Sequence, residues 1–139
     1  MRVVSRFGVS MDKDLLSEFD KLISYKGYKN RSKAICDLVR EKIIEEEWKF
    51  ANKNTVGTVT IVYNHHTKEV AEVLTHLQHE HYSSILSNLH IHLDPHNCLE
   101  VLVVKGKVKD IKRISDRIIA SRGVKHGRLT MTTSGKRLP

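Results

Sequence analysis

Residues 89–101 read LHIHLDPHNCLEV, and this stretch determines how the C-terminal half of the chain is interpreted. Leucine and isoleucine alternate with His90 and His92, which is the two-residue period of a β-strand. The segment DPHN at 94–97 has the composition of a tight turn, and a second apolar run begins at Cys98. The stretch therefore predicts a β-hairpin that carries imidazoles along one face.

The hairpin also predicts which side chains lie opposite one another. The apolar residues of its first strand, Leu89, Ile91 and Leu93, are expected to face a helical layer. His90 and His92 would then lie on the uncovered face, with Cα atoms about 7 Å apart. A five-residue loop over 93–97 places Cys98 opposite His92 and Glu100 opposite His90, whereas a four-residue loop would put Cys98 on the other face, so only the five-residue register allows a shared metal site. We therefore expect a metal site formed by the two imidazoles and the thiolate, with Glu100 supporting the ligands.

The pattern around the hairpin alternates between strand and helix periods. The expected elements are strand 55–64, helix 67–83, strand 85–93, strand 98–105, helix 107–121 and strand 124–133. This strand–helix–strand–strand–helix–strand order is the ferredoxin-like order, in which both helices cover one face of the sheet. The fold class is therefore α+β.

The N-terminal part predicts a separate module. Residues 3–10 alternate as a short strand, Asp12 can cap a first helix, and GYKN at 27–30 separates that helix from a second one. About 45 residues with one strand cannot enclose such an apolar core, so we expect two copies to pair their strands. The alternative is that the helical hairpin packs onto the rest of the chain. EEEWKFANKN at 45–54 loses periodicity, so the predicted domains are 1–50 and 51–139.

The composition narrows the class of protein. The formal charge is +8 with a pI of about 9.6, which favours polyanions such as nucleic acid as partners. Cys36 and Cys98 are the only cysteines, too few for a disulfide framework. No signal peptide is recognisable, and no apolar run approaches the roughly 20 residues that span a bilayer. We therefore expect a cytoplasmic protein without membrane association.

Histidines gather in one region, since eight of the nine lie between His65 and His96. His79 projects about 200° round its helix from Leu77, away from its own sheet. It is therefore expected to complete the metal site of a neighbouring subunit. The remaining histidines of the region are expected to be surface or auxiliary residues: His65, His66, His76, His81 and His96. Tetrahedral ligation would indicate zinc, and square-planar ligation nickel(II) or copper(II), and spacing leaves this open.

The chain resembles the nickel-responsive transcriptional regulators (NikR) over essentially its whole length. The resemblance rests on GYKNRSKAI, on IVYNHH and above all on H79-x10-H90-x-H92-x5-C98-L-E. It implies an N-terminal ribbon–helix–helix DNA-binding domain and a C-terminal ferredoxin-like domain of the ACT type. It also implies one square-planar Ni²⁺ per subunit, held across a tetramer interface with His79 from the partner subunit.

The resemblance also implies how DNA is contacted. The family's base-reading positions match Arg6, Gly8 and Ser10, and its phosphate-contacting positions match Arg31, Ser32 and Lys68. Arg6 can read guanine bidentately, whereas Gly8 departs from the usual hydroxyl residue. The family also has an auxiliary cation site. At one of its acidic positions this chain has Lys33, although Asp37 remains.

The resulting prediction is a homotetrameric, nickel-dependent repressor of nickel-uptake genes that binds a palindromic operator as a dimer of dimers. It is not expected to be an enzyme. The competing hypotheses are a regulator of copper, zinc or cobalt with the same architecture, a metal-dependent hydrolase, an amino-acid-sensing regulator and a metal-storage protein. A hydrolase needs an open coordination position and a placed general base, and no motif supplies the base.

Overall fold

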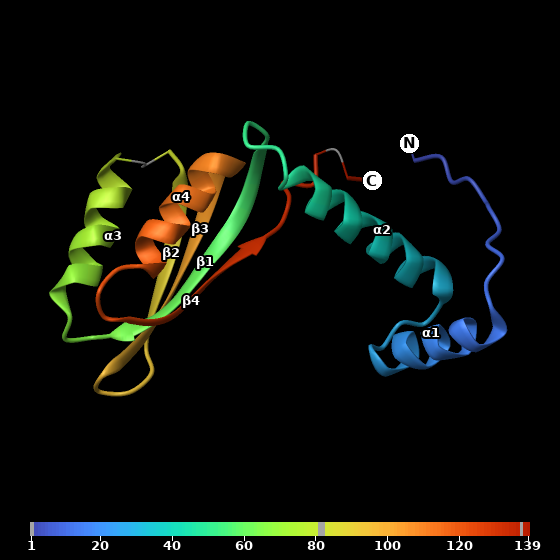
Figure 1. Ribbon diagram of the computed structural model, residues 1–139, viewed down its shortest axis with the longest axis horizontal. Helices are drawn as coiled ribbons and strands as arrows, with labels where there is room; N and C mark the ends of the chain where they lie inside the picture. The colour runs from blue at the N-terminus through green and yellow to red at the C-terminus, as the bar shows by residue number, and fades with distance from the viewer. Residues whose placement is uncertain (1, 81–82, 137) are drawn as a thin grey trace. The chain divides into compact units, whose positions relative to one another are not determined.

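The computed structural model describes residues 2–80, 83–136 and 138–139. Its elements follow one another as shown in Figure 1: α1 (Lys13–Tyr25), α2 (Arg31–Glu47), β1 (Asn54–Asn64), α3 (Lys68–Glu80), β2 (Ile85–His92), β3 (Asn97–Lys107), α4 (Val108–Ile119) and β4 (Val124–Met131). The chain forms two compact units, residues 1–41 and 42–139.

The two helices of the first unit begin where the sequence predicts. The Asp12 side chain accepts hydrogen bonds from the backbone N–H groups of Asp14 and Leu15, which caps α1. Asn30 Oδ1 accepts the Lys33 N–H at 2.9 Å at the start of α2. Residues 2–12 form neither helix nor strand in this single chain. The predicted strand 3–10 requires a second chain to pair with and stays a prediction.

The first unit exposes most of its apolar side chains. Only Ile23 and Ala34 are buried hydrophobic residues in its described part, 2–41. The exposed ones include Val3, Phe7, Val9, Leu15, Leu22, Leu38 and Val39. The apolar stripes predicted for both helices therefore lack a cover within this unit.

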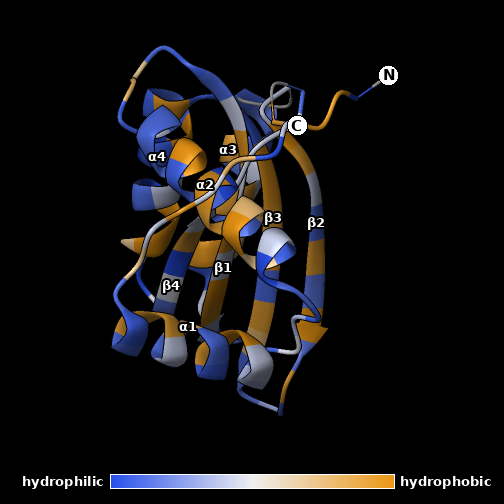
Figure 2. Cartoon of the chain, turned by 90° about the vertical axis from the view of Figure 1, so that its right-hand side faces the viewer, coloured by the Kyte–Doolittle hydropathy of each residue, from blue (hydrophilic) through white to orange (hydrophobic). Residues whose placement is uncertain are grey.

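The second unit contains an antiparallel sheet in the order β2-β3-β1-β4 with two helices on one face (Figure 1). Every second residue of β1 is buried, and the bands of hydrophobic residues are visible on the strands in Figure 2. The helices pack against that face through Val70, Leu74 and Leu77 of α3 and Ile111, Ile114 and Ile118 of α4. Spacings of three and four residues place each set on one side of its helix. The predicted β-α-β-β-α-β order is confirmed.

The end of α2 belongs to the second unit. Ile44 and Trp48 are buried in its core, and Trp48 Nε1 donates to the Thr132 carbonyl at 2.9 Å. The compact units therefore divide within α2, between Glu41 and Lys42. The assignment of functions to residues 1–50 and 51–139 stays a prediction.

The predicted register of the hairpin is confirmed, but the predicted facing of β2 is wrong. His90 pairs with Glu100 and His92 with Cys98. Cys98 and Glu100 are 0% and 3% exposed on the helix-covered face, so His90 and His92 lie on that face too. The side chains that face away from the helices are Leu89, Ile91 and Leu93, which are 58%, 42% and 54% exposed.

The physical reason lies in β3. Its residues Leu102 and Val104 are buried beneath the helices, and the alternation that places them there also carries Cys98 and Glu100 inward. Val101, whose side chain points to the opposite face of the sheet, is apolar as well, so the open face of the sheet is also hydrophobic. Pairing with β3 decides which face of the sheet each side chain of β2 occupies, whatever the pattern of β2 itself.

Among the described residues, no helix is long and apolar enough to cross a membrane.

Candidate metal centre

Four nitrogen and sulfur donors converge at one end of the sheet. They belong to His65, His90, His92 and Cys98, whose ligand atoms all lie within 4.8 Å of one another. His90 and His92 lie in the last three residues of β2, Cys98 is the second residue of β3, and His65 directly follows β1. Three strands that are neighbours in the sheet therefore bring the group together.

Cys98 lies at the centre of this group. Its Sγ is 3.3 Å from His65 Nδ1 and 3.4 Å from His92 Nδ1. The side chain is fully buried, and burial, with a smaller contribution from the negative charges of Glu100 and Asp94, raises the pKa of the Cys98 thiol. In the metal-free protein the sulfur therefore keeps its proton, and a bound cation would displace it.

His90 is held by two buried neighbours. Its Nδ1 lies 2.8 Å from Glu100 Oε1 and 3.1 Å from the Tyr63 hydroxyl. The Tyr63 hydroxyl donates to the same Glu100 oxygen at 3.3 Å, and burial followed by the Glu100 charge raises the pKa of Tyr63. A carboxylate at Nδ1 favours the tautomer with the proton on Nδ1, which leaves Nε2 free to bind a metal. Glu100 therefore lies where a supporting residue was predicted.

His65 was predicted to be a surface or auxiliary residue, yet the structure places it among the donors. It follows Tyr63 by two residues, and Tyr63 pairs with Cys98. The same parity carries His65 to the Cys98 side, and its backbone N–H donates to the His96 carbonyl at 2.7 Å. The sequence signal for His65 is the two-residue alternation of β1: continued one residue beyond the end of the strand, it places His65 on the same face as Tyr63.

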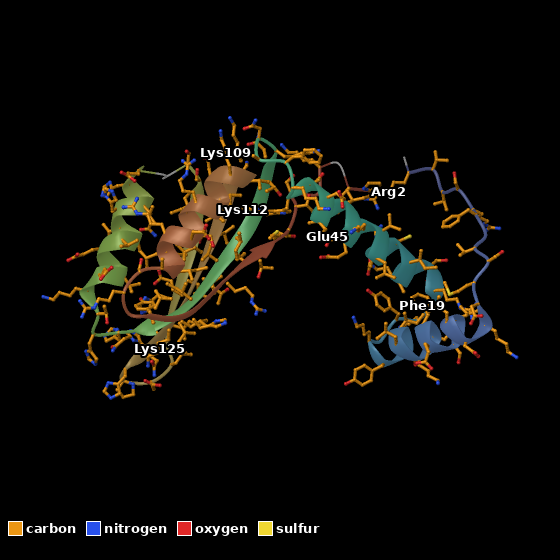
Figure 3. All side chains as sticks on the ribbon, in the orientation of Figure 1. Arg2, Phe19, Glu45, Lys109, Lys112 and Lys125 are labelled. Carbon is orange, nitrogen blue, oxygen red and sulfur yellow. The ribbon has the colours of Figure 1, made fainter. Side chains whose placement is uncertain are left out.

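The loop that carries His65 packs closely on Gly123. This glycine has φ +97°, and a Cβ there would lie 2.6 Å from Thr67 Cγ2. Its carbonyl accepts the Asn64 N–H at 2.9 Å. Two residues further along the chain, Lys125 of β4 (Figure 3) donates to Asn97 Oδ1 at 2.6 Å. Both contacts hold the segments that carry the donors.

His79 lies on the exposed side of α3, where it lines a shallow pocket with Ala71, Glu72, Thr75 and His76. Its predicted direction, away from its own core, is confirmed. The expectation that the whole sheet separates it from the donors of its own chain is wrong, because His90, His92 and Cys98 lie on the helix-covered face. Within the described residues the converging group nonetheless does not include His79.

The other histidines have contacts of their own. His76 Nε2 lies 3.0 Å from Glu80 Oε1 on α3. The rings of His66 and His96 are 5.5 Å apart beside His65. His81 lies outside the described residues.

The residues predicted to contact DNA are all exposed. Arg6, Gly8 and Ser10 lie in the extended N-terminal segment, Ser32 lies in the first turn of α2, and Lys68 begins α3. Arg31 makes two bonds to the Asp20 carboxylate, at 2.8 and 2.7 Å. This hydrogen-bonded guanidinium lowers the pKa of Asp20. A DNA phosphate would therefore compete with Asp20 for Arg31.

Asp37, the remaining residue of the auxiliary cation site, is already surrounded by donors. Lys33 Nζ, Tyr28 OH and Arg40 Nη1 approach its carboxylate at 2.6, 2.8 and 2.9 Å. The bond from Lys33, followed by that from Tyr28, lowers the pKa of Asp37. The carboxylate is thus neutralised by side chains of its own unit.

The chemistry of the converging group fits a transition metal. Imidazole suits nickel, copper and zinc, and thiolate adds a soft anionic ligand to the set. The supporting carboxylate on His90 is the arrangement common at histidine-ligated metals. The set fits nickel without selecting it over the other two metals.

Comparisons with known proteins supply that selection. Residues 56–132 match the model of the NikR C terminal nickel binding domain. Proteins named as nickel-responsive regulators are 56% identical in Geotalea uraniireducens and 52% identical in Pyrococcus furiosus, each over 96% of this chain and 96% of the relative. An uncharacterized protein from Thermotoga maritima, 17% identical, shares the fold over 58% of this chain and all of its own, with a TM-score of 0.51. The chain therefore belongs to the family of nickel-responsive regulators.

Proposed function

We propose that this protein is a nickel-dependent, DNA-binding transcriptional repressor that controls nickel uptake. The observation that carries the proposal is the convergence of three imidazoles and a buried thiol within 4.8 Å in the domain that matches the family model. When bound, nickel acts as a ligand that changes the protein's preference among arrangements. The regulator family also implies that the protein is not an enzyme.

The proposed nickel ligands are His90, His92 and Cys98 of one chain and His79 of the partner subunit. The exposure of His79 on the outer side of α3 supports this arrangement, because it leaves the imidazole available to a second chain. His65 is the competing fourth donor, since it already lies 3.3 Å from Cys98 Sγ in the single chain. In either case four protein ligands complete the set and leave no open coordination position for a substrate. This disfavours the hypothesis of a metal-dependent hydrolase.

Uncovered apolar surfaces support a homotetramer built as a dimer of dimers. In the first unit, exposed Phe7 lies in the N-terminal segment and exposed Leu38 in α2, and two copies can cover these residues together. In the second unit, the open sheet face exposes Leu89 and Leu93. A face of this kind is costly to leave in water, so a second copy is expected to cover it.

The proposed DNA contacts come from the first unit and from the start of α3. Two N-terminal strands, paired as a ribbon, would present Arg6, Gly8 and Ser10 to base edges in the major groove. Arg31 and Ser32 at the start of α2, together with Lys68, would contact phosphate. Two-fold symmetry of the ribbon then requires a palindromic operator. A DNA-binding repressor of this kind works in the cytoplasm.

An electrophoretic mobility shift on DNA from upstream of the protein's own gene tests the proposal. We expect a sequence-specific complex that forms with nickel and is lost when nickel is chelated. Zinc, copper and cobalt at equal free concentration serve as controls and should give a weaker response. A complex that forms equally with and without metal, or none at all, would contradict the proposed function.

A further inference from the structure

A polar pocket lies at the end of the sheet opposite the metal centre. Its volume is about 390 Å³. Four segments supply its lining: the last residue of α2, the start of β1, the end of β3 and the C-terminal segment 133–136. The metal donors, by contrast, lie where β1 ends and β3 begins. The pocket is therefore separate from the nickel site.

Backbone contacts hold these segments together. The Thr132 N–H donates to the Val56 carbonyl at 3.2 Å, which ties the C-terminal segment to β1. Val56 pairs with Lys105 in the β1–β3 register, so their side chains project on the same face. The Val108 N–H donates to the Lys53 carbonyl at 2.9 Å. The pocket is therefore built on strands rather than on one loop.

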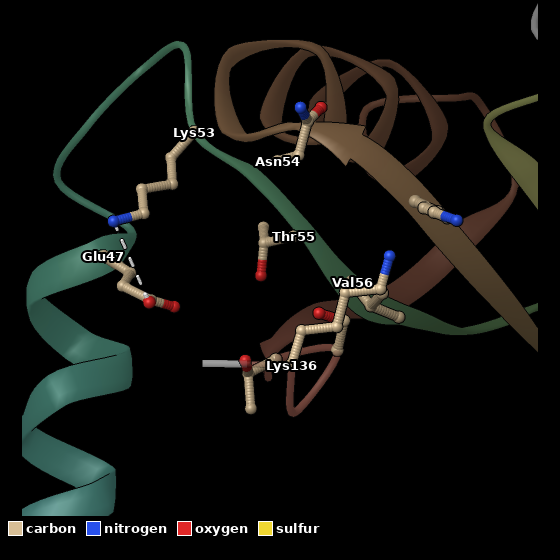
Figure 4. A pocket seen from close by; sticks show the side chains of 9 residues that line it. Glu47, Lys53, Asn54, Thr55, Val56 and Lys136 are labelled. Carbon is tan, nitrogen blue, oxygen red and sulfur yellow. Dashed lines mark ion pairs between the residues drawn. The ribbon is translucent and has the colours of Figure 1, made fainter. Parts of the chain in front are cut away.

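Positive charge dominates the pocket. Lys53, Lys105 and Lys136 line it, and Glu47 is the single carboxylate among the described lining residues; Figure 4 shows Glu47, Lys53 and Lys136 around the hollow. Glu47 Oε1 lies 4.0 Å from Lys53 Nζ, so this pair is already formed. Within the described ranges, neither Lys105 nor Lys136 forms an ion pair with an Asp or Glu side chain, whereas Lys53 does. In the part of the chain that the structure describes, Lys105 and Lys136 therefore border the hollow without a side-chain carboxylate as a partner.

Hydroxyl groups complete the lining. Thr133 Oγ1 accepts the Gly135 N–H at 3.2 Å, which leaves its own proton to donate. Ser134 and Asn54 add further donors, and Thr55 is 3% exposed with its hydroxyl bound to the Thr132 carbonyl. Ammonium groups with neutral donors around a concave site suit a phosphate group. The hollow shape favours a small molecule over the backbone of a nucleic acid.

We propose that this pocket binds a small phosphate-bearing anion through Lys105 and Lys136, with Thr133 and Ser134 as neutral donors. Lys53 remains paired with Glu47 and contributes secondarily. The affinity should fall as salt is added, because the two ammonium groups are partly exposed to solvent. The pocket does not involve the nickel ligands, so anion binding should proceed in metal-free protein.

Calorimetric titration of the full-length protein with inorganic phosphate and with pyrophosphate, at low ionic strength, tests the proposal. We expect saturable binding of one anion per chain, tighter for pyrophosphate. Backbone amide shifts of Asn54, Thr55 and Ser134 should move during the titration. The double variant Lys105→Gln with Lys136→Gln should bind about tenfold more weakly or worse.

The matched control changes the same number of charges at exposed lysines outside the pocket, Lys29→Gln with Lys109→Gln, and should bind like the wild type. Both double variants should keep the nickel absorption spectrum, which establishes that they fold. Absence of saturable binding in the wild type, or an equal loss in the control, would overturn the proposal. The proposal is also overturned if the wild type binds neither phosphate nor pyrophosphate and the pocket variant no longer binds operator DNA.

Discussion

Replacing Glu100 with glutamine should weaken nickel binding while leaving every proposed ligand in place. Glutamine keeps the size of the side chain, so the core beside Cys98 remains filled. It removes the carboxylate that lies 2.8 Å from His90 Nδ1 and orients that imidazole. Loss of such a supporting carboxylate costs about 10–100-fold in metal affinity, or ~1.4–2.7 kcal/mol.

A second effect of the same substitution has the opposite sign. Burial, and to a smaller degree the Glu100 charge, raise the pKa of Cys98, so glutamine should make the thiolate easier to form. A bound divalent cation deprotonates a coordinating thiol by itself, so this gain is small beside the lost orientation of His90. The net result should therefore be weaker binding. Because Cys98 must release a proton, nickel affinity should rise with pH until its raised pKa is passed.

Asp94→Asn provides the matched control. Asp94 also raises the pKa of Cys98, but it does not contact His90, and asparagine keeps an Oδ1 acceptor for the turn at His96 and Asn97. Competition with a chelator of known nickel affinity measures all three proteins. The reasoning is refuted if Glu100→Gln binds nickel like the wild type, or if Asp94→Asn loses as much affinity.

Three further substitutions test the ligand set, the DNA contact and the fold. Cys98→Ala should abolish the thiolate-to-nickel charge-transfer absorption while light scattering still reports the same oligomer; an unchanged spectrum would exclude Cys98 as a ligand. Arg6→Ala should lose discrimination between operator and random DNA, by about 1–3 kcal/mol per contact, at unchanged nickel stoichiometry. Trp48→Ala should lower the free energy of unfolding by about 3–5 kcal/mol in urea titrations, since this residue is 2% exposed.

The hairpin register could be predicted from sequence only through the metal hypothesis, because a loop of five residues places Cys98 opposite His92 and Glu100 opposite His90, whereas a loop of four residues would not. The helical stripes of α3 and α4 follow equally from local spacing. Which residues of β2 face the helices could not be predicted, because β3 has apolar residues on both faces of the sheet. Val101 and Leu102 are neighbours on opposite faces, and a hydrophobicity pattern does not say which one the helices cover.

The donor group shows a similar division. His90, His92 and Cys98 were predicted from the hairpin, and the structure brings them together. His65 was missed, because its position depends on pairing of β1 with β3 across 33 residues of sequence. Contacts between subunits pose a further problem, because no single-chain pattern reports them. Whether His79 of the partner subunit is a nickel ligand must therefore be tested by experiment.

His65 and His79 make opposite predictions as the fourth nickel ligand. If His79 of the partner subunit completes the site, His79→Ala should lose tight nickel binding and His65→Ala should largely keep it. If His65 of the same chain completes the site, the outcomes should be reversed. Nickel stoichiometry, measured together with the oligomer mass, distinguishes the two arrangements. We expect the first result, because His79 faces outward on α3.

Mixing two defective proteins provides the decisive form of this test. His79→Ala chains keep Cys98, and Cys98→Ala chains keep His79, so neither protein alone can form a complete site with His79. When subunits exchange, a mixed pair would combine an intact Cys98 with an intact His79 from the other chain. Regained thiolate-to-nickel absorption, growing with time under exchange conditions, is therefore expected. Nickel would then link two subunits and favour the arrangement that binds DNA. If mixed tetramers form, as mass analysis can verify, yet no absorption returns, all four ligands come from one chain and this coupling is excluded.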